Sequence, residues 1–302
     1  MEDYKKYLNP ETLSKLKGLD LKARLIVEGY VSGLHKSPYQ GFSVEFAEHR
    51  EYVPGDDLRY VDWKVYGKTD RYYLKRYEEE TNFSCYVLLD TSESMRYRSE
   101  HAAVSKLEYA RYVAAALGYL VVQQQDAIGL ATFDSQVSNF LRASGTPSHL
   151  KRLFRVMEET PAGGETSIGP ILHELAERIR KRGLILILSD LFDNTRALLT
   201  GLKHFRHHRH DVSVLQIIDP AEQDFPFEAP TLFKGLEGLP DELADPRALR
   251  KAYQQEFTGF LRQVRQGCRD VGMEYTLLRT DQPLDVALSS FLTRRMQRSG
   301  RV

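Results

Sequence analysis

Residues 86–95 read Tyr86-Val87-Leu88-Leu89-Asp90-Thr91-Ser92-Glu93-Ser94-Met95. The run begins with four apolar or aromatic residues and continues with polar turn chemistry, a pattern typical of a strand buried on both faces. Ligands of open parallel sheets bind just beyond the carboxyl ends of such strands. We therefore expect Asp90, Ser92 and Ser94 to lie together at that edge. One carboxylate and two hydroxyls suit a hard divalent cation, above all Mg2+.

Residues 90–94 also have a simpler interpretation, in which Asp90 and the serines only accept hydrogen bonds from the backbone of a strand-to-helix turn. Two later stretches favour the cation site. Thr166 follows a flexible glycine pair, Gly163-Gly164, and residues 184–189 form a second apolar run that ends at Asp190. The pattern Asp-x-Ser-x-Ser, followed in order by this threonine and this acid, resembles the metal-ion-dependent adhesion site of von Willebrand factor A-type domains.

The resemblance implies a set of roles for these side chains. Ser92, Ser94 and Thr166 would bind Mg2+ (or Mn2+) directly, whereas Asp90 and Asp190 would act mostly through ordered water. One coordination position would stay open to a carboxylate from a partner protein. A site of this kind binds a partner and does not by itself activate a nucleophile.

The sequence also departs from the adhesion-site pattern. Glu93 and Glu165 add negative charge beside the expected ligands, and Leu191 follows Asp190 where adhesion domains commonly have glycine. Alternatives exist for two of the ligands: Asp193 for Asp190, and Thr160 or Ser167 for Thr166. Thr166 fits the glycine spacing best.

Composition is that of an ordinary globular protein and excludes several classes of function. The 302 residues can form one large domain or two smaller ones, and a net charge of zero favours neither nucleic acid nor anionic membrane as partner. The beginning of the chain leads to no signal-peptide core, and the longest apolar stretch, residues 112–122, is too short to span a bilayer. The two cysteines, Cys85 and Cys268, predict no disulfide scaffold. We expect a cytoplasmic protein without membrane insertion.

The order of apolar runs predicts a doubly wound α/β fold, and the resemblance implies that it is of the von Willebrand factor A-like kind. Strands are expected at 86–90, 126–133, 184–189, 212–218 and 274–279, with an antiparallel edge strand at 136–141, and helices at 100–125 (capped by Ser99), 147–159, 167–181, 194–207, from 245 and from 283. Alternation of this kind gives a doubly wound, mostly parallel sheet with helices on both faces. Leu249 is expected to face inward from the helix that begins at 245. We assign residues 81–302 to this domain, with an insertion at about 220–272, and residues 1–80 to a smaller N-terminal helical and β segment. Residues 219–240 lack periodicity and form a candidate lid or docking surface.

A second dense motif lies in the N-terminal segment. It runs from Glu45 to Lys64 and contains Asp56, Asp57, Asp62 and the only tryptophan, Trp63. The three acids are candidates for a second metal cluster, but we favour a Pro-Gly turn in which they pair with nearby arginines, with Trp63 as a core anchor. The whole motif, followed closely by the strand that ends at Asp90, resembles the bacterial domain of unknown function family fifty-eight. Members of that family carry a von Willebrand A-like domain and are typically paired with MoxR-type AAA+ ATPases.

Three functions are compatible with these residues. The first is a non-catalytic, cation-dependent protein-interaction module, which the resemblance implies would join a MoxR-type AAA+ ATPase, or its client, in chaperone-like remodelling or maturation. The second is a metal-dependent hydrolase, although the sequence lacks a Gly-x-Ser-x-Gly elbow and a Walker A loop. The third is a structural domain whose metal site has decayed. We expect the first.

Overall fold

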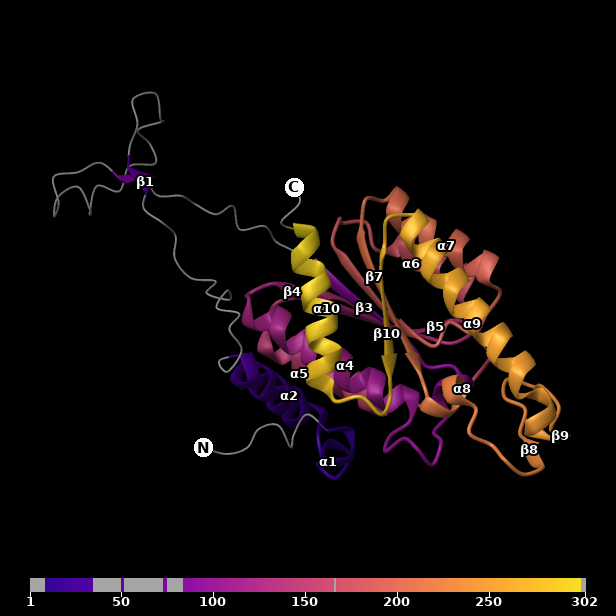
Figure 1. The fold of residues 1–302 in the computed structure, drawn as a ribbon. Coiled ribbons are helices and arrows are strands. Elements are labelled where there is room, and N and C mark those ends of the chain that lie inside the picture. The colour runs from indigo at the N-terminus through magenta and orange to yellow at the C-terminus, as the bar shows by residue number, and fades with distance from the viewer. Residues whose placement is uncertain (1–8, 35–49, 52–72, 75–83, 166, 300–302) are drawn as a thin grey trace. The chain divides into compact units, whose positions relative to one another are not determined.

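The structure is a computed structural model and describes residues 9–34, 50–51, 73–74, 84–165 and 167–299 (Figure 1). The chain separates into two compact units, one of residues 1–33 and 83–302 and one of residues 34–82. In the smaller unit, β1 (Arg50–Glu51) pairs antiparallel with β2 (Tyr73–Leu74). The division into 1–80 and 81–302 stays a prediction.

The larger unit is built on a six-stranded sheet in the order β10-β7-β6-β3-β4-β5. Its strands are β3 (Ser84–Asp90), β4 (Ala127–Phe133), β5 (Val137–Ser144), β6 (Leu184–Ser189), β7 (Asp211–Ile218) and β10 (Glu274–Arg279). All neighbours are parallel except β4 and β5, so the predicted antiparallel edge strand is confirmed. The chain runs outward from β3 to β5 and then resumes on the other side of β3 with β6. The strand order therefore reverses between β3 and β6, where doubly wound folds bind their ligands.

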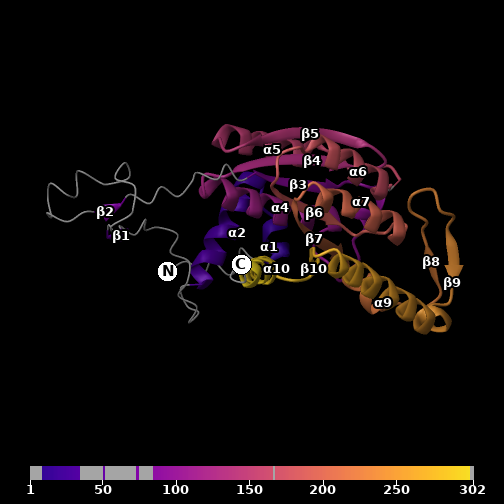
Figure 2. The same cartoon turned by 90° about the horizontal axis from the view of Figure 1, so that it is seen from above.

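Helices cover both faces of the sheet, which confirms the predicted fold class (Figures 1 and 2). One face carries α4 (Lys106–Gln123), α5 (Pro147–Glu159) and α10 (Leu284–Ser299), and the other carries α6 (Ile168–Arg178), α7 (Thr195–His207) and α9 (Pro246–Asp270). Two N-terminal helices, α1 (Pro10–Ser14) and α2 (Leu19–Leu34), precede the sheet. Lys22 of α2 donates a hydrogen bond to the Tyr112 hydroxyl of α4 at 3.0 Å, so α2 contacts α4.

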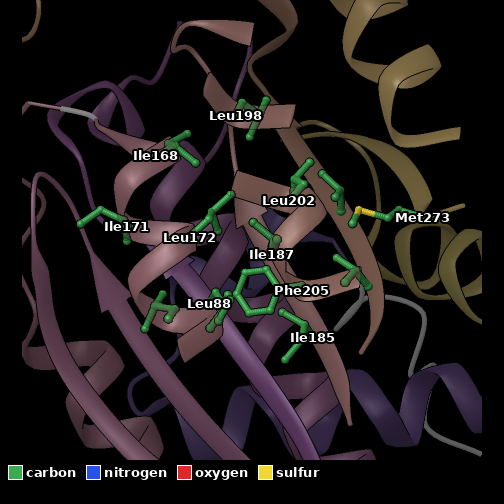
Figure 3. Close-up of a cluster of buried hydrophobic side chains, with 14 of the residues drawn as sticks. Leu88, Ile168, Ile171, Leu172, Ile185, Ile187, Leu198, Leu202, Phe205 and Met273 are labelled. Carbon is green, nitrogen blue, oxygen red and sulfur yellow. The ribbon is translucent and has the colours of Figure 1, made fainter. Parts of the chain in front are cut away.

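The core on the α6 and α7 face follows from the alternation of side chains along the strands. Leu88 of β3 and Ile185 and Ile187 of β6 point to this face, where they meet Leu172 and Phe205 from the helices (Figure 3). All five side chains are fully buried. Burial of one such side chain stabilises the fold by about 1.5–3 kcal/mol, so this layer holds the two central strands in place.

Three features differ from the sequence prediction. Ser105, not Ser99, caps α4 by accepting a hydrogen bond from the Glu108 amide, because the Ser99 amide is tied to Asp219 at 2.9 Å and residues 97–104 only approach the helix. Residues 219–245 are not structureless but contain α8 (Pro220–Asp224) and a hairpin of β8 (Thr231–Phe233) and β9 (Glu242–Ala244). Leu249 is 46% exposed, because the first turns of α9 extend past the sheet toward this hairpin.

Gly129 of β4 gives a direct test of this packing. A Cβ at this position would overlap the Tyr86 ring and lie 2.9 Å from the Leu141 carbonyl oxygen. The ring is held because its hydroxyl accepts a hydrogen bond from the Ala143 amide, at 3.2 Å. We expect Gly129→Ala to lower the free energy of unfolding by about 1–3 kcal/mol, measured by urea denaturation.

The matched control is Gly259→Ala in α9, where a Cβ meets no atom within 4 Å. Because glycine weakens a helix interior, this change should raise stability by about 0.5–1 kcal/mol. Equal effects of the two substitutions would show that the β4 contact is not tight.

Candidate metal centre

Asp90 is the last residue of β3 and is completely buried. One carboxylate oxygen, Oδ1, accepts a hydrogen bond from the Ser92 amide at 2.9 Å. The other, Oδ2, accepts one from the hydroxyl of Ser189, the last residue of the neighbouring strand β6, at 2.5 Å. The turn expected under the simpler interpretation is therefore present, and it fixes the carboxylate at the edge where the strand order reverses.

Ser92 and Ser94 follow Asp90 in the turn that comes after β3. They flank the start of a short 3-10 helix, η3 (Glu93–Arg96), and their hydroxyl oxygens are 3.1 Å apart in a buried position. Ser92 precedes the first residue of η3, but its side chain accepts no capping hydrogen bond. Its hydroxyl instead shares a hydrogen bond with that of Ser94 and hydrogen-bonds the Asp90 carboxylate, so the two hydroxyls lie side by side next to the acid, as two ligands of one ion would.

The glycine loop, which contains Gly163 and Gly164, contacts the turn that holds Ser92 and Ser94. The Glu93 amide donates to the Gly164 carbonyl at 3.0 Å, and the Gly163 amide donates to the Thr91 carbonyl at 2.8 Å. Gly164 has a φ of +80°, which glycine adopts without strain. Thr166 lies outside the described residues, as do Asp56, Asp57, Asp62 and Trp63 of the N-terminal motif.

Asp190 follows β6 and is also completely buried. Its Oδ1 accepts the Phe192 amide at 3.2 Å, and its carbonyl oxygen accepts the Gln216 side-chain amide at 2.7 Å. The structure thus brings Asp90, Ser92, Ser94 and Asp190 to one edge of the sheet. The alternatives serve local structure: Asp193 caps α6 through the Ile168 amide at 2.7 Å, and the Thr160 hydroxyl donates to the Val156 carbonyl at the end of α5. Ser167 precedes α6 without capping it through its side chain.

Sequence reasoning missed Lys106, the first residue of α4 and a fully buried lysine. Its ammonium donates to Asp190 Oδ2 at 2.7 Å and to Glu222 Oε1 of α8 at 2.5 Å, and it lies 4.7 Å from the centre of the Phe192 ring. One signal was available in the sequence, because a lysine opens a helix that is mostly apolar after its first turns. Its two partners, Asp190 and Glu222, come from distant segments, and no pattern in the sequence links either of them to Lys106.

The charges at this edge do not balance. Burial, and then the charge of Asp190, raise the pKa of Asp90 to about 7, despite hydrogen bonds from Ser189 and Ser92 that lower it. Burial alone would lower the pKa of Lys106, but Asp190 and Glu222 raise it overall, so the lysine is cationic. The Lys106 ammonium contacts Asp190 and Glu222, whereas the Asp90 carboxylate is buried close enough to Asp190 for that charge to raise its pKa. This buried pair of acids, together with the neighbouring hydroxyls of Ser92 and Ser94, fits a bound cation.

In the described part of the chain, no three His, Cys, Asp or Glu side chains converge as a metal cluster would require. Any cation site at this edge therefore depends on hydroxyl ligands supported by carboxylates. Within the same described residues, no helix is long and apolar enough to cross a membrane.

The strand order and the Asp-x-Ser-x-Ser turn define a von Willebrand factor A-like α/β domain. The chain belongs to the family described as "Protein of unknown function DUF58", whose model matches residues 48–259. It is 24% identical over 280 residues to the uncharacterized protein Mb1516 of Mycobacterium bovis, which covers 91% of this chain and 86% of the relative.

Two solved structures are similar in shape. The hypothetical protein BatB from Bacteroides thetaiotaomicron aligns at 15% identity with a TM-score of 0.47, over 71% of this chain and 99% of its own. The VWA domain of SpRpn10 aligns at 14% identity with a TM-score of 0.42, over 69% and 94%.

Removal of the Lys106 charge should be costly. Lys106→Met would leave Asp190 and Glu222 buried without their cation, and loss of one partner of a buried pair typically costs about 3–5 kcal/mol. We expect a decrease of this size in the free energy of unfolding, measured with urea in EDTA. Lys151→Met on the exposed side of α5 is the control and should change stability by less than about 0.5 kcal/mol. A loss no larger than that of the control would mean that the buried pair is not formed.

The raised pKa of Asp90 predicts a pH-dependent effect. Between pH about 4 and about 7 the unfolded chain releases the Asp90 proton while the folded protein retains it, so this group's contribution to stability falls as pH rises and is constant above about 7. Asp90→Asn removes that loss. In EDTA, we expect the variant to gain roughly 1–3 kcal/mol over wild type at pH 8 and much less at pH 5. A gain that does not depend on pH would contradict the assignment.

Proposed function

We propose that this chain is a divalent-cation-dependent protein-interaction module. The observation that carries the proposal is the burial of Asp90 and Asp190 at the ends of adjacent strands, beside the paired hydroxyls of Ser92 and Ser94. Two buried carboxylates need compensation, and Lys106 lies in hydrogen-bond contact with only one of them. Mg2+ or Mn2+ supplies the missing charge and prefers oxygen ligands.

In the proposed site, Ser92 and Ser94 hold the cation together with Thr166, and the two aspartates stabilise it from the second layer. Bound there, the cation offers a Lewis-acidic position to an acidic side chain of a partner. The protein's own contribution is to keep the serine hydroxyls together and to orient Asp90 through Ser189. A site in which the serine hydroxyls serve as metal ligands does not by itself activate a nucleophile, so we propose a binding protein and not an enzyme.

Family membership suggests the partner. The resemblance of the sequence to MoxR-associated proteins favours a MoxR-type AAA+ ATPase, or its client, in a cytoplasmic complex that remodels or matures other proteins. The acid that reaches the cation would come from that partner.

Metal binding is the first test. We expect calorimetric titration with Mg2+ and with Mn2+ to show one site per chain, and expect Ser92→Ala with Ser94→Ala to weaken binding by roughly 10- to 100-fold. Ser148→Ala, on the exposed part of α5, should leave the affinity unchanged. No binding by wild type at millimolar metal would favour a decayed site.

The partner is tested separately. A pull-down with the MoxR-type ATPase of the same organism should lose the ATPase on addition of EDTA and in the Asp90→Ala variant. Retention under both conditions would refute a bridge through the metal while leaving the partnership intact.

A further inference from the structure

The loop between β8 and β9 reaches the candidate metal centre from a distant part of the chain. We call residues 234–241 the cover loop. Glu237 Oε1 accepts a hydrogen bond from the amide of Ser94 at 3.4 Å, and the Glu237 amide donates to the Glu93 carboxylate at 2.9 Å. The next residue, Gly238, lies beside Glu165 of the glycine loop, since a Cβ there would be 3.4 Å from Glu165 Oε1. The cover loop therefore meets two of the loops that form the site.

The conformation of the cover loop is determined by its own sequence. A Cβ on Gly235 would overlap the Leu239 carbonyl oxygen, and the Gly235 amide donates to Asp241 at 3.0 Å, so the turn closes tightly on itself. Glu237 adopts a left-handed φ of 55°, which costs a non-glycine residue about 1–2 kcal/mol. That conformation carries the Glu237 amide and carboxylate to Glu93 and Ser94.

The hairpin is anchored at its base and not at its tip. Phe225 stacks on Phe233 and on Tyr253 of α9, the latter with ring centres 4.4 Å apart, and Phe227 packs edge-on against both Phe225 and Phe233. Figures 1 and 2 both show the hairpin beside the first turns of α9. Other apolar side chains of the hairpin face solvent: the paired Leu232 and Leu243 of the two strands are 53% and 72% exposed, and Leu239 of the cover loop is 70% exposed. Lifting the tip off the site would thus break polar contacts and uncover little apolar surface.

The contacts between the cover loop and the site also bring acids together. Glu93, Glu165 and Glu237 come from three separate segments and lie along the contact between the cover loop and the site: Glu93 accepts the Glu237 amide, Glu165 lies beside Gly238, and Glu237 accepts the Ser94 amide. Like charges in such proximity repel one another, and a divalent cation among them reverses the balance. Closure of the cover loop is therefore expected to depend on the cation.

We propose that Glu237 is an internal ligand of the metal centre, which takes the coordination position that a partner's acid would otherwise fill. The inference rests on the proposed function, because it needs a cation at Ser92 and Ser94. As part of the same chain, Glu237 acts at a high effective concentration, so that a partner must displace it. The cover loop thus makes the module self-inhibited.

The test uses Mn2+ as the probe and the isosteric variant Glu237→Gln. The glutamine keeps the hydrogen bond from Ser94 but is a much weaker metal ligand than a carboxylate. We expect Glu237→Gln to bind Mn2+ about tenfold more weakly in calorimetry. Its bound Mn2+ should relax water protons faster than in wild type, because a water fills the position that Glu237 leaves. Added acetate should bind at that position and displace the water, so that water relaxation slows again. This should need less acetate in the variant than in wild type, where acetate must compete with Glu237. Glu242→Gln, exposed in β9 of the same hairpin, should match wild type throughout.

The outcomes separate the two proposals. Wild type that binds Mn2+ with the same affinity and water relaxation as Glu237→Gln would overturn the internal ligand and leave the cation-dependent module in place. Wild type that binds no Mn2+ would overturn both. An equal change in Glu242→Gln would also overturn the assignment to Glu237, since it would reflect the general charge of the hairpin.

Discussion

Two buried carboxylates at the ends of adjacent parallel strands impose the constraint on which this structure depends. Asp90 ends β3 and Asp190 follows β6, and the two strands meet where the order of the sheet reverses. Parallel strands place their carboxyl ends at one edge, so this proximity follows from the topology and not from any local preference of the acids. The low-dielectric surroundings then make their repulsion severe. Much of the surrounding chain supplies compensation for it.

Lys106 connects this compensation to the rest of the fold. Because it opens α4 and contacts Asp190 and Glu222, the start of that helix, the end of β6 and α8 are held by one ammonium. On the other side of Asp190, the Gln216 side chain donates to its carbonyl oxygen and in turn accepts the Tyr275 hydroxyl at 2.6 Å, which continues the network to β10. A change of charge at this edge therefore affects hydrogen bonds in β7 and β10, which carry none of the proposed ligands. The site and the stability of the domain cannot be altered independently.

The sequence predicted the parts of this arrangement that are local. The apolar runs that became β3, β4, β6 and β7 were recognisable because each is buried on both faces, and the run of β10, at the edge of the sheet, was recognisable although it is only partly buried. The polar residues that end β3 and β6 could be assigned to one edge from the rule for parallel strands alone. The rest arises from contacts over long separations. Lys106 hydrogen-bonds Glu222 across a sequence separation of 116 residues, and Ser94 hydrogen-bonds Glu237 across one of 143. No sequence pattern detects pairs so far apart. The early start assigned to α4 failed for the same reason, since Ser99 is held by Asp219.

Three of the residues that escaped prediction, Asp219, Glu222 and Glu237, come from one segment, 219–245, and this has a consequence for how such a domain can be regulated. Asp219 and Glu222 enter the network through Ser99 and Lys106, and Glu237 enters it through Ser94. The segment thus supplies acids to the network around the proposed cation, while the turn after β3 supplies the serine hydroxyls. Since a cation's preference for an external acid depends on the negative charge already around it, this one segment would set the affinity for a partner without any change in the serines. On the proposals above, the strands determine that a cation is bound, and the hairpin that interrupts them determines how readily another protein can reach it.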